Sequence, residues 1–310
     1  MIGAETQLGP TGNGYARVSR RWNGPRMFIC LCGLGGMCFL PGVRSKYLHV
    51  IGIGIQNTLV YRANFFFRAA FSLIPLIGTM MLWRAVYDGK AGAQIGNYDF
   101  SQMITYYLIV MVVDALTAVT DDDWQIAGDI KDGNISQFLL KPINYLIYRL
   151  CLFFSGRLVY TLSAAIPVGL FLAYHHANLV YPKEALTWVI FLTSLLLTAV
   201  LQFMISCTMA FLAFWVLEVG TFVFILFAIE NIAGGHLFPL DILPAWLLQL
   251  LQFTPFPYLL YFPVSIYLGH VHGQALINGL LIQAAWVVTA ILLARFVWGR
   301  GIQKYSAVGG

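Results

Sequence analysis

The stretch Thr187–Phe214, TWVIFLTSLLLTAVLQFMISCTMAFLAF, decides the fold of this chain. It holds 28 residues and contains no Asp, Glu, Lys or Arg. An α-helix rises about 1.5 Å per residue, so this run is long enough to cross a hydrocarbon core of about 30 Å. An apolar run of this length predicts a helix that spans a membrane.

The whole chain has the composition of a membrane protein. Of its 310 residues, 59% are hydrophobic and 10% are charged, whereas a soluble domain carries about 25% charged residues. Aromatic residues make up 15%, and many lie near the ends of apolar runs, as in an interfacial belt. The net charge of +5 does not indicate nucleic-acid binding, because no basic run is interleaved with aromatic residues.

Six apolar segments are long enough to span the membrane. They run over residues 69–86, 103–120, 150–173, 187–214, 217–235 and 275–298. A seventh, Ala245–Phe253, is too short to cross and is bracketed by prolines, so it predicts a short re-entrant or interfacial helix. The expected fold is an all-α polytopic membrane protein with short re-entrant helices on the outer side after span five.

The N-terminal part divides into two. Residues 1–43 are glycine-rich, polar and basic before a short apolar run, and we expect a disordered or non-native extension with Val43 as the true initiator. Residues 44–68 place apolar side chains at helical spacing and predict an interfacial helix. A six-helix transmembrane domain over 69–299 and a cytoplasmic tail over 300–310 follow.

The basic residues set the orientation. With the N-terminus inside, fifteen of the 18 Lys and Arg residues fall on the cytoplasmic side. This bias predicts that both termini are cytoplasmic.

The sequence lacks the common catalytic motifs. It contains no P-loop, no H-E-x-x-H and no G-x-S-x-G. His270 and His272 could offer two imidazoles, but no carboxylate accompanies them, so we expect no metal site. We therefore expect no catalytic residue in this chain.

The predicted cytoplasmic loop Asp121–Pro142 mixes charge, glycine turns and an apolar patch. Ile135, Phe138 and Leu139 lie three and four residues apart, so a short helix would present them together. A solvated loop does not need such a patch, whereas a helix that docks on another protein does.

Three charged residues lie well away from the ends of the predicted spans: Asp114, Arg157 and Glu230. By helix rise, Asp114 and Arg157 lie at a similar depth, so we expect an ion pair, because a lone charge there is costly. In the other interpretation, Arg157 reaches the headgroups and Asp114 faces a wet cavity. Glu230 has no matched partner and is the better candidate to line a cargo path.

Several motifs in order carry a resemblance to a known family. The segments that carry it are Lys46-Tyr47-Leu48, Tyr61-Arg62-Ala63-Asn64-Phe65, Ile130-Lys131-Asp132-Gly133-Asn134-Ile135, Leu139-Leu140-Lys141-Pro142 and Phe238-Pro239-Leu240. Over about residues 43–305 the chain resembles the permease subunit of type-2 ABC exporters, in the branch of uncharacterised bacterial transport permeases.

The resemblance implies a membrane-spanning subunit of the bacterial cytoplasmic (inner) membrane that moves cargo outward by alternating access. It implies a separate ATPase subunit, which would bind ATP and Mg²⁺, and a second permease subunit, either different or a copy of this chain. The other contacts would be with membrane lipid. The residues we expect to couple the subunits are Asp129, Lys131, Asp132, Gly133, Asn134, Phe138, Leu139, Lys141 and Pro142.

Two other functional classes are possible. An ion-coupled secondary transporter or channel would use intramembrane ionisable groups as relays, and Asp114, Arg157 and Glu230 are the candidates. No inverted repeat is visible to support this alternative. An intramembrane enzyme would need a nucleophile and a base, which the sequence does not offer. In the other interpretation, the coupling residues form an ordinary polar loop.

Overall fold

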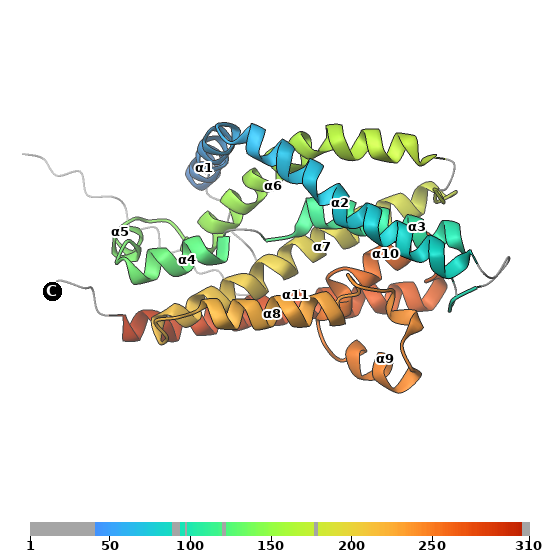
Figure 1. Ribbon diagram of the computed structural model, residues 1–310. Helices are drawn as coiled ribbons and strands as arrows, with labels where there is room; N and C mark the ends of the chain where they lie inside the picture. The colour runs from blue at the N-terminus through green and yellow to red at the C-terminus, as the bar shows by residue number, and fades with distance from the viewer. Residues whose placement is uncertain (1–40, 89–93, 97, 120–121, 177–178, 306–310) are drawn as a thin grey trace, which may run out of the picture. The chain divides into compact units, whose positions relative to one another are not determined.

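A computed structural model describes residues 41–88, 94–96, 98–119, 122–176 and 179–305 (Figure 1). The extension expected over residues 1–43 falls almost wholly outside the described residues and stays a prediction. The described part of the chain is helical, with one isolated bridge between Ile95 and Tyr98.

The helices follow one another in this order: α1 Pro41–Leu59, α2 Arg62–Tyr87, α3 Phe100–Thr117, α4 Asp122–Lys131, α5 Ile135–Leu139, α6 Tyr145–Tyr174, α7 Ala185–Ala210, η2 Phe211–Phe214, α8 Gly220–Ala233, η3 Leu240–Ile242, α9 Ala245–Gln252, η4 Phe256–Tyr258, α10 Tyr261–Leu268 and α11 Gly273–Lys304. Five of them, α2, α3, α6, α7 continued by η2, and α11, are long and apolar enough to cross a membrane. The expected all-helical, multi-span class is therefore confirmed.

The fifth predicted span, residues 217–235, is shorter than the sequence indicated. Its helix is α8, which has 14 residues and rises about 21 Å, less than the roughly 30 Å of a hydrocarbon core. The helix ends at Gly234, and Gly235 has a φ of 93°, which favours glycine. The amide of Tyr261 donates to the carbonyl of Gly234 at 3.0 Å, so α10 begins beside the end of α8.

The predicted interfacial helix is divided. Residues 44–68 do not form one helix, because the chain turns at Val60 and Tyr61 and separates α1 from α2. The first long helix therefore starts at Arg62 rather than near residue 69. Both α1 and α2 pack on α6. The position of α1 at a membrane surface stays a prediction.

The short helix expected over Ala245–Phe253 forms as α9. In the order of the chain, α9 comes with η3, η4 and α10 after α8 and before α11. In space, Figure 1 shows α9 and α10 toward one end of the long helices. Helices α4 and α5 lie toward the other end, where α11 finishes. The expectation that α9 is re-entrant or interfacial stays a prediction.

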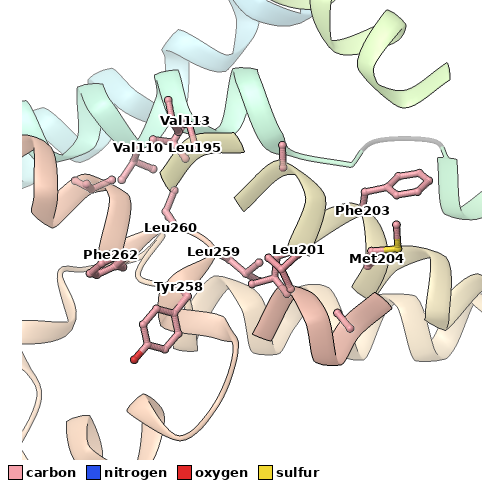
Figure 2. Close-up of a cluster of buried hydrophobic side chains, with 14 of the residues drawn as sticks. Val110, Val113, Leu195, Leu201, Phe203, Met204, Tyr258, Leu259, Leu260 and Phe262 are labelled. Atoms are coloured by element: carbon pink, nitrogen blue, oxygen red, sulfur yellow. The ribbon is translucent and has the colours of Figure 1, made fainter. Parts of the chain in front are cut away.

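The core lies where α3, α7, α10 and α11 meet. Val110 and Val113 of α3, Leu195 of α7 and Leu260 beside α10 belong to one buried cluster (Figure 2). Helix α11 approaches closely at Gly279, where a Cβ would lie 2.2 Å from the Phe262 ring. A small polar network is held in this core: Gln283 donates to the carbonyl of Tyr258 at 3.0 Å and accepts from the buried Ser194 hydroxyl at 2.9 Å.

Candidate functional site

A cavity of about 480 Å³ gathers the three ionisable residues singled out in the sequence. Asp114 comes from α3, Arg157 from α6 and Glu230 from α8, and all three line it. Apolar residues of α2 and α3, such as Leu76 and Val110, complete much of its wall. A mixed lining of this kind is typical of small-molecule sites, in which a few polar groups fix the ligand's orientation.

Asp114 has a partner that the sequence did not suggest. His236 Nε2 lies 3.1 Å from Asp114 Oδ1. His236 reaches it because α8 stops after 14 residues and the chain turns at Gly234 and Gly235. The expected pairing of Asp114 with Arg157 stays a prediction.

Glu230 also has a hydrogen-bond partner in the cavity. Its carboxylate accepts a hydrogen bond from Gln202 Nε2 of α7 at 3.0 Å. Gln202 and Glu230, together with Arg68, also line a second cavity of about 410 Å³ that reaches Trp124 of α4. Polar side chains therefore border both cavities, from His236 toward α4.

Arg157 is buried, with 7% of its surface exposed. Its guanidinium lies 5.3 Å from the centroid of the Tyr160 ring and 5.8 Å from that of Phe153. Stacking on aromatic rings stabilises a guanidinium that has left bulk water.

The α4–α5 segment, residues 122–142, is the part of the predicted loop that the structure describes. Gly133, between the two helices, has a φ of 77°, a conformation in which glycine is favoured. Helix α5 begins two residues later, at Ile135, and is the short helix that the apolar spacing indicated. Lys131, Asp132, Asn134, Lys141 and Pro142 are exposed around it.

The apolar patch of this segment is divided between two faces. Ile135 is fully buried, and the Phe138 ring packs at 5.3 Å from Tyr145 and 5.0 Å from Tyr148. Leu139 and Leu140 point away, with 48% and 89% of their surfaces exposed. The patch thus anchors α5 on α6 and also presents two leucines outward.

Asp129 lies inside this segment rather than on its surface. Its carboxylate forms an ion pair with Arg149 of α6 and accepts a hydrogen bond from Tyr145 Oη at 2.8 Å. Arg149 also donates to Gln125 Oε1 at 3.1 Å. We refer to Gln125, Asp129, Tyr145 and Arg149 as the Asp129 cluster, and it fastens α4 to α6.

A second carboxylate cluster lies near α10. Asp241 accepts hydrogen bonds from Tyr98 Oη, at 2.8 Å, and from Tyr261 Oη, and its Oδ2 lies 4.0 Å from His270 Nδ1. We refer to these four residues as the Asp241 cluster. Burial raises the pKa of Tyr98, and the nearby Asp241 charge raises it further. Burial lowers the pKa of His270, opposed by the charge of Asp241.

The sequence offered weak signals for the partners it did not identify. Gln202 is the one amide side chain in the run Thr187–Phe214, which marks it as an exception in an apolar helix. His236 follows Gly234 and Gly235, a turn signal at the end of a predicted span. Arg149 is one of the fifteen basic residues that the predicted orientation places on the cytoplasmic side, and nothing in the sequence sets it apart from the others.

Comparison with known proteins places the chain in a family. The family described as ABC-2 family transporter protein matches residues 73–309, which is most of the chain and includes α3 through α11. No curated protein matches the chain. The matched region contains Asp114, Arg157 and Glu230, both carboxylate clusters and four of the five long helices in full. The chain therefore belongs to the ABC-2 transporter family and is a multi-pass membrane permease of that family.

Proposed function

We propose that this permease is the membrane-spanning subunit of an ATP-driven exporter and that its ATPase docks on the α4–α5 segment. The exposed pair Leu139–Leu140 carries this proposal, since two adjacent leucines outside a buried cluster fit a protein partner. ATP and Mg²⁺ would be bound by that partner. A second permease, identical or different, would complete the assembly in the bacterial cytoplasmic membrane, with both termini of this chain cytoplasmic.

The surroundings of α5 support transmission of a push from the partner. Phe138 packs on Tyr145, and the Tyr145 ring stacks on Trp298 of α11 with centroids 4.9 Å apart. The Asp129 cluster ties α4 to α6 a short distance away. Movement of α5 would therefore reach α6 and α11 together, because packed aromatic side chains transmit displacement rather than absorb it.

The cavity that holds Asp114 and Glu230 is the proposed cargo path. Its shared lining with the cavity beside Trp124 supports a route that begins near the ATPase side. Alternating access would open this route first toward α4 and then toward the end that carries α10. Cargo would leave outward, as in the exporters that the chain resembles.

The docking proposal is tested by adding charge to α5. We expect the double variant Leu139→Asp/Leu140→Asp to lose transport and co-purification of the ATPase while its amount in the membrane stays normal. Gln137→Asp is the matched control, because it adds a carboxylate at an exposed position of the same helix. Full transport and full ATPase recovery by the double variant would refute the proposal.

An ion-coupled transporter is the second candidate, favoured by the pairing of Asp114 with His236 beside Glu230. Such a machine needs ionisable groups that load and release a cation within the membrane. The two candidates separate in vesicles. A protonophore would stop an ion-coupled transporter, whereas removal of ATP would stop the ABC exporter.

A further inference from the structure

Trp124 of α4 packs against the beginning of α8. A Cβ added at Gly220, the first residue of α8, would lie 2.8 Å from Trp124 Cη2. Gly220 does not have a positive φ, so its backbone would accept other residues. Because glycine is a poor helix former, its presence here has a packing reason, and that reason is the close approach of the Trp124 ring.

The same ring borders the second cavity, of about 410 Å³. Helix α4 contributes Asp123 and Trp124 to its lining, and α8 contributes Gly220, Val223 and Glu230 among others. The contact between Trp124 and Gly220 therefore lies at the boundary of this cavity, where α4 meets α8. Movement of the ring away from Gly220 would widen the cavity at that boundary.

The contact is one that the protein can break at low cost. Trp124 has 54% of its surface exposed, whereas Phe203 of α7 and Phe211 of η2 are fully buried. The free energy of burial follows the apolar area removed from water, so a ring that is already half exposed loses little when it moves. Trp124 can therefore swing while the buried aromatic rings stay in place.

Helix α4 connects this ring to the α5 helix. It has ten residues and rises about 15 Å, with Trp124 near its beginning and Gly133 and α5 after its end. Between the two lies the attachment to α6, where Arg149 donates to Gln125 Oε1 at 3.1 Å and pairs with Asp129. A displacement of α5 would tilt α4 about this attachment and shift Trp124 relative to Gly220.

We propose that Trp124 is the inner gate of the cargo path. The seam between α4 and α8 is shut while the ring lies on Gly220, and it opens when α4 tilts. This assignment rests on the proposed function, because it gives that path a gate. Closure of the gate is nevertheless a property of this chain alone, so it is measured without the ATPase.

The test follows the access of a polar reagent to the cavity. Val223 lies three residues after Gly220, on the same face of α8, and lines the cavity, so Val223→Cys places a thiol there. The full-length chain in inside-out membrane vesicles is treated with a charged, membrane-impermeant thiol reagent. Mass spectrometry gives the labelling rate at position 223, which separates it from the native cysteines.

Two changes should open the gate in this Val223→Cys background. Trp124→Ala removes the ring, and Gly220→Ala adds a methyl group that the ring must avoid. We expect each to speed labelling about tenfold, which is about 1.4 kcal/mol in the closing equilibrium. The double variant should label no faster than Trp124→Ala alone, because the methyl group acts only through the ring. The added Cβ would also lie 2.7 Å from Glu218 Oε1, but this flexible side chain can move aside.

Two matched controls change the same residue types elsewhere. Gly78→Ala adds a Cβ that meets nothing within 4 Å, and Trp215→Ala removes a tryptophan that is 40% exposed and outside the cavity lining. Both should leave the labelling rate unchanged. Unchanged labelling in both gate variants overturns the proposal. So does equal acceleration by a control, or acceleration in the double variant that is the product of the two single effects.

Failure of the proposed function would look different. The variant Leu139→Asp/Leu140→Asp would then keep its ATPase and its transport, while Trp124→Ala and Gly220→Ala would still speed the labelling at position 223. Failure of the gate alone would leave the docking result intact and remove the effect on labelling.

Discussion

The Asp129 cluster and the Asp241 cluster each hold a carboxylate that accepts a hydrogen bond from a tyrosine, but they do so in different ways. Asp129 pairs with a buried arginine 20 residues further along the chain. Asp241 is held by neutral hydroxyls, one of them on Tyr98, 143 residues away. The first cluster is local and charged, and it lies beside two exposed leucines. The second joins distant segments, and the side chains of Tyr98 and His270 are buried or nearly so.

The difference teaches which region can move. A local cluster joins neighbouring helices, so α4, α5 and the start of α6 can shift together without breaking it. A cluster made from distant segments fixes the loops near α10 to one another. We therefore expect motion to enter at the Asp129 cluster and the Asp241 cluster to resist it.

The largest expected effect comes from removing the charge at Asp129, which tests whether the ion pair with Arg149 holds α4 on α6. Asp129→Ala leaves Arg149, which is 5% exposed, without its carboxylate. Because an uncompensated buried charge is costly, we expect a loss of about 3–5 kcal/mol in the free energy of unfolding. An SDS-titration assay measures it, with exposed Asp132→Asn as the control. A loss below about 1 kcal/mol would mean that the ion pair does not hold α4.

The two regions each contain a glycine with positive φ, and their environments differ. A Cβ at Gly235 would lie 2.7 Å from Tyr106 Oη, whereas at Gly133 its nearest neighbour would be 3.6 Å away. Backbone strain and crowding together should make Gly235→Ala cost about 2–4 kcal/mol. Gly133→Ala carries the strain alone, about 1 kcal/mol. Equal losses of stability in the same assay would contradict this difference.

A milder change tests how much one uncharged hydroxyl donor contributes to the Asp241 cluster. Tyr98→Phe removes one of the two hydroxyls that donate to Asp241 and leaves Tyr261 in place. We expect a loss of about 1–2 kcal/mol, the usual contribution of one such hydrogen bond. A larger loss than that of Asp129→Ala would reverse the ranking of the two clusters.

The smallest expected effect is a dependence on pH near α10. Burial lowers the pKa of His270, so the folded protein favours the neutral ring. Stability from this group is therefore present above the ordinary histidine pKa of 6.5 and is lost as the pH falls below it. Melting curves of wild type and His270→Gln between pH 8 and 5 isolate the contribution of His270 to the pH dependence of stability. An identical acid response of the two proteins would show that His270 does not contribute.

Much of the fold follows from hydropathy and spacing. The long apolar runs predict α3, α6, α7 and α11, and the prolines around Ala245 correctly delimit α9. The spacing of Ile135 and Phe138 predicts α5. The break at Val60–Tyr61 was not predictable, because neither residue is a helix breaker. The early end of α8 depends on Gly234 and Gly235, whose effect on a hydropathy average is small.

The candidate site was predictable in part. Charge inside an apolar run singles out Asp114, Arg157 and Glu230, and the structure brings them to one cavity. Their partners were not predictable, because His236 is 122 residues from Asp114 and Gln202 is 28 from Glu230. Contacts of this kind depend on packing between helices, which a single sequence does not record.

The break between α8 and α10 has a consequence for the access of water. A membrane protein must not let protons or ions leak along it, and unpaired carbonyls at such a break would recruit water. Here the carbonyls of Gly234, Gly235 and Leu237 accept from the Tyr261 amide, Tyr106 Oη and Tyr107 Oη, at 3.0, 2.6 and 2.7 Å. Two phenol groups and one amide thus pair all three carbonyls within the protein, so these carbonyls do not need water as a hydrogen-bond partner.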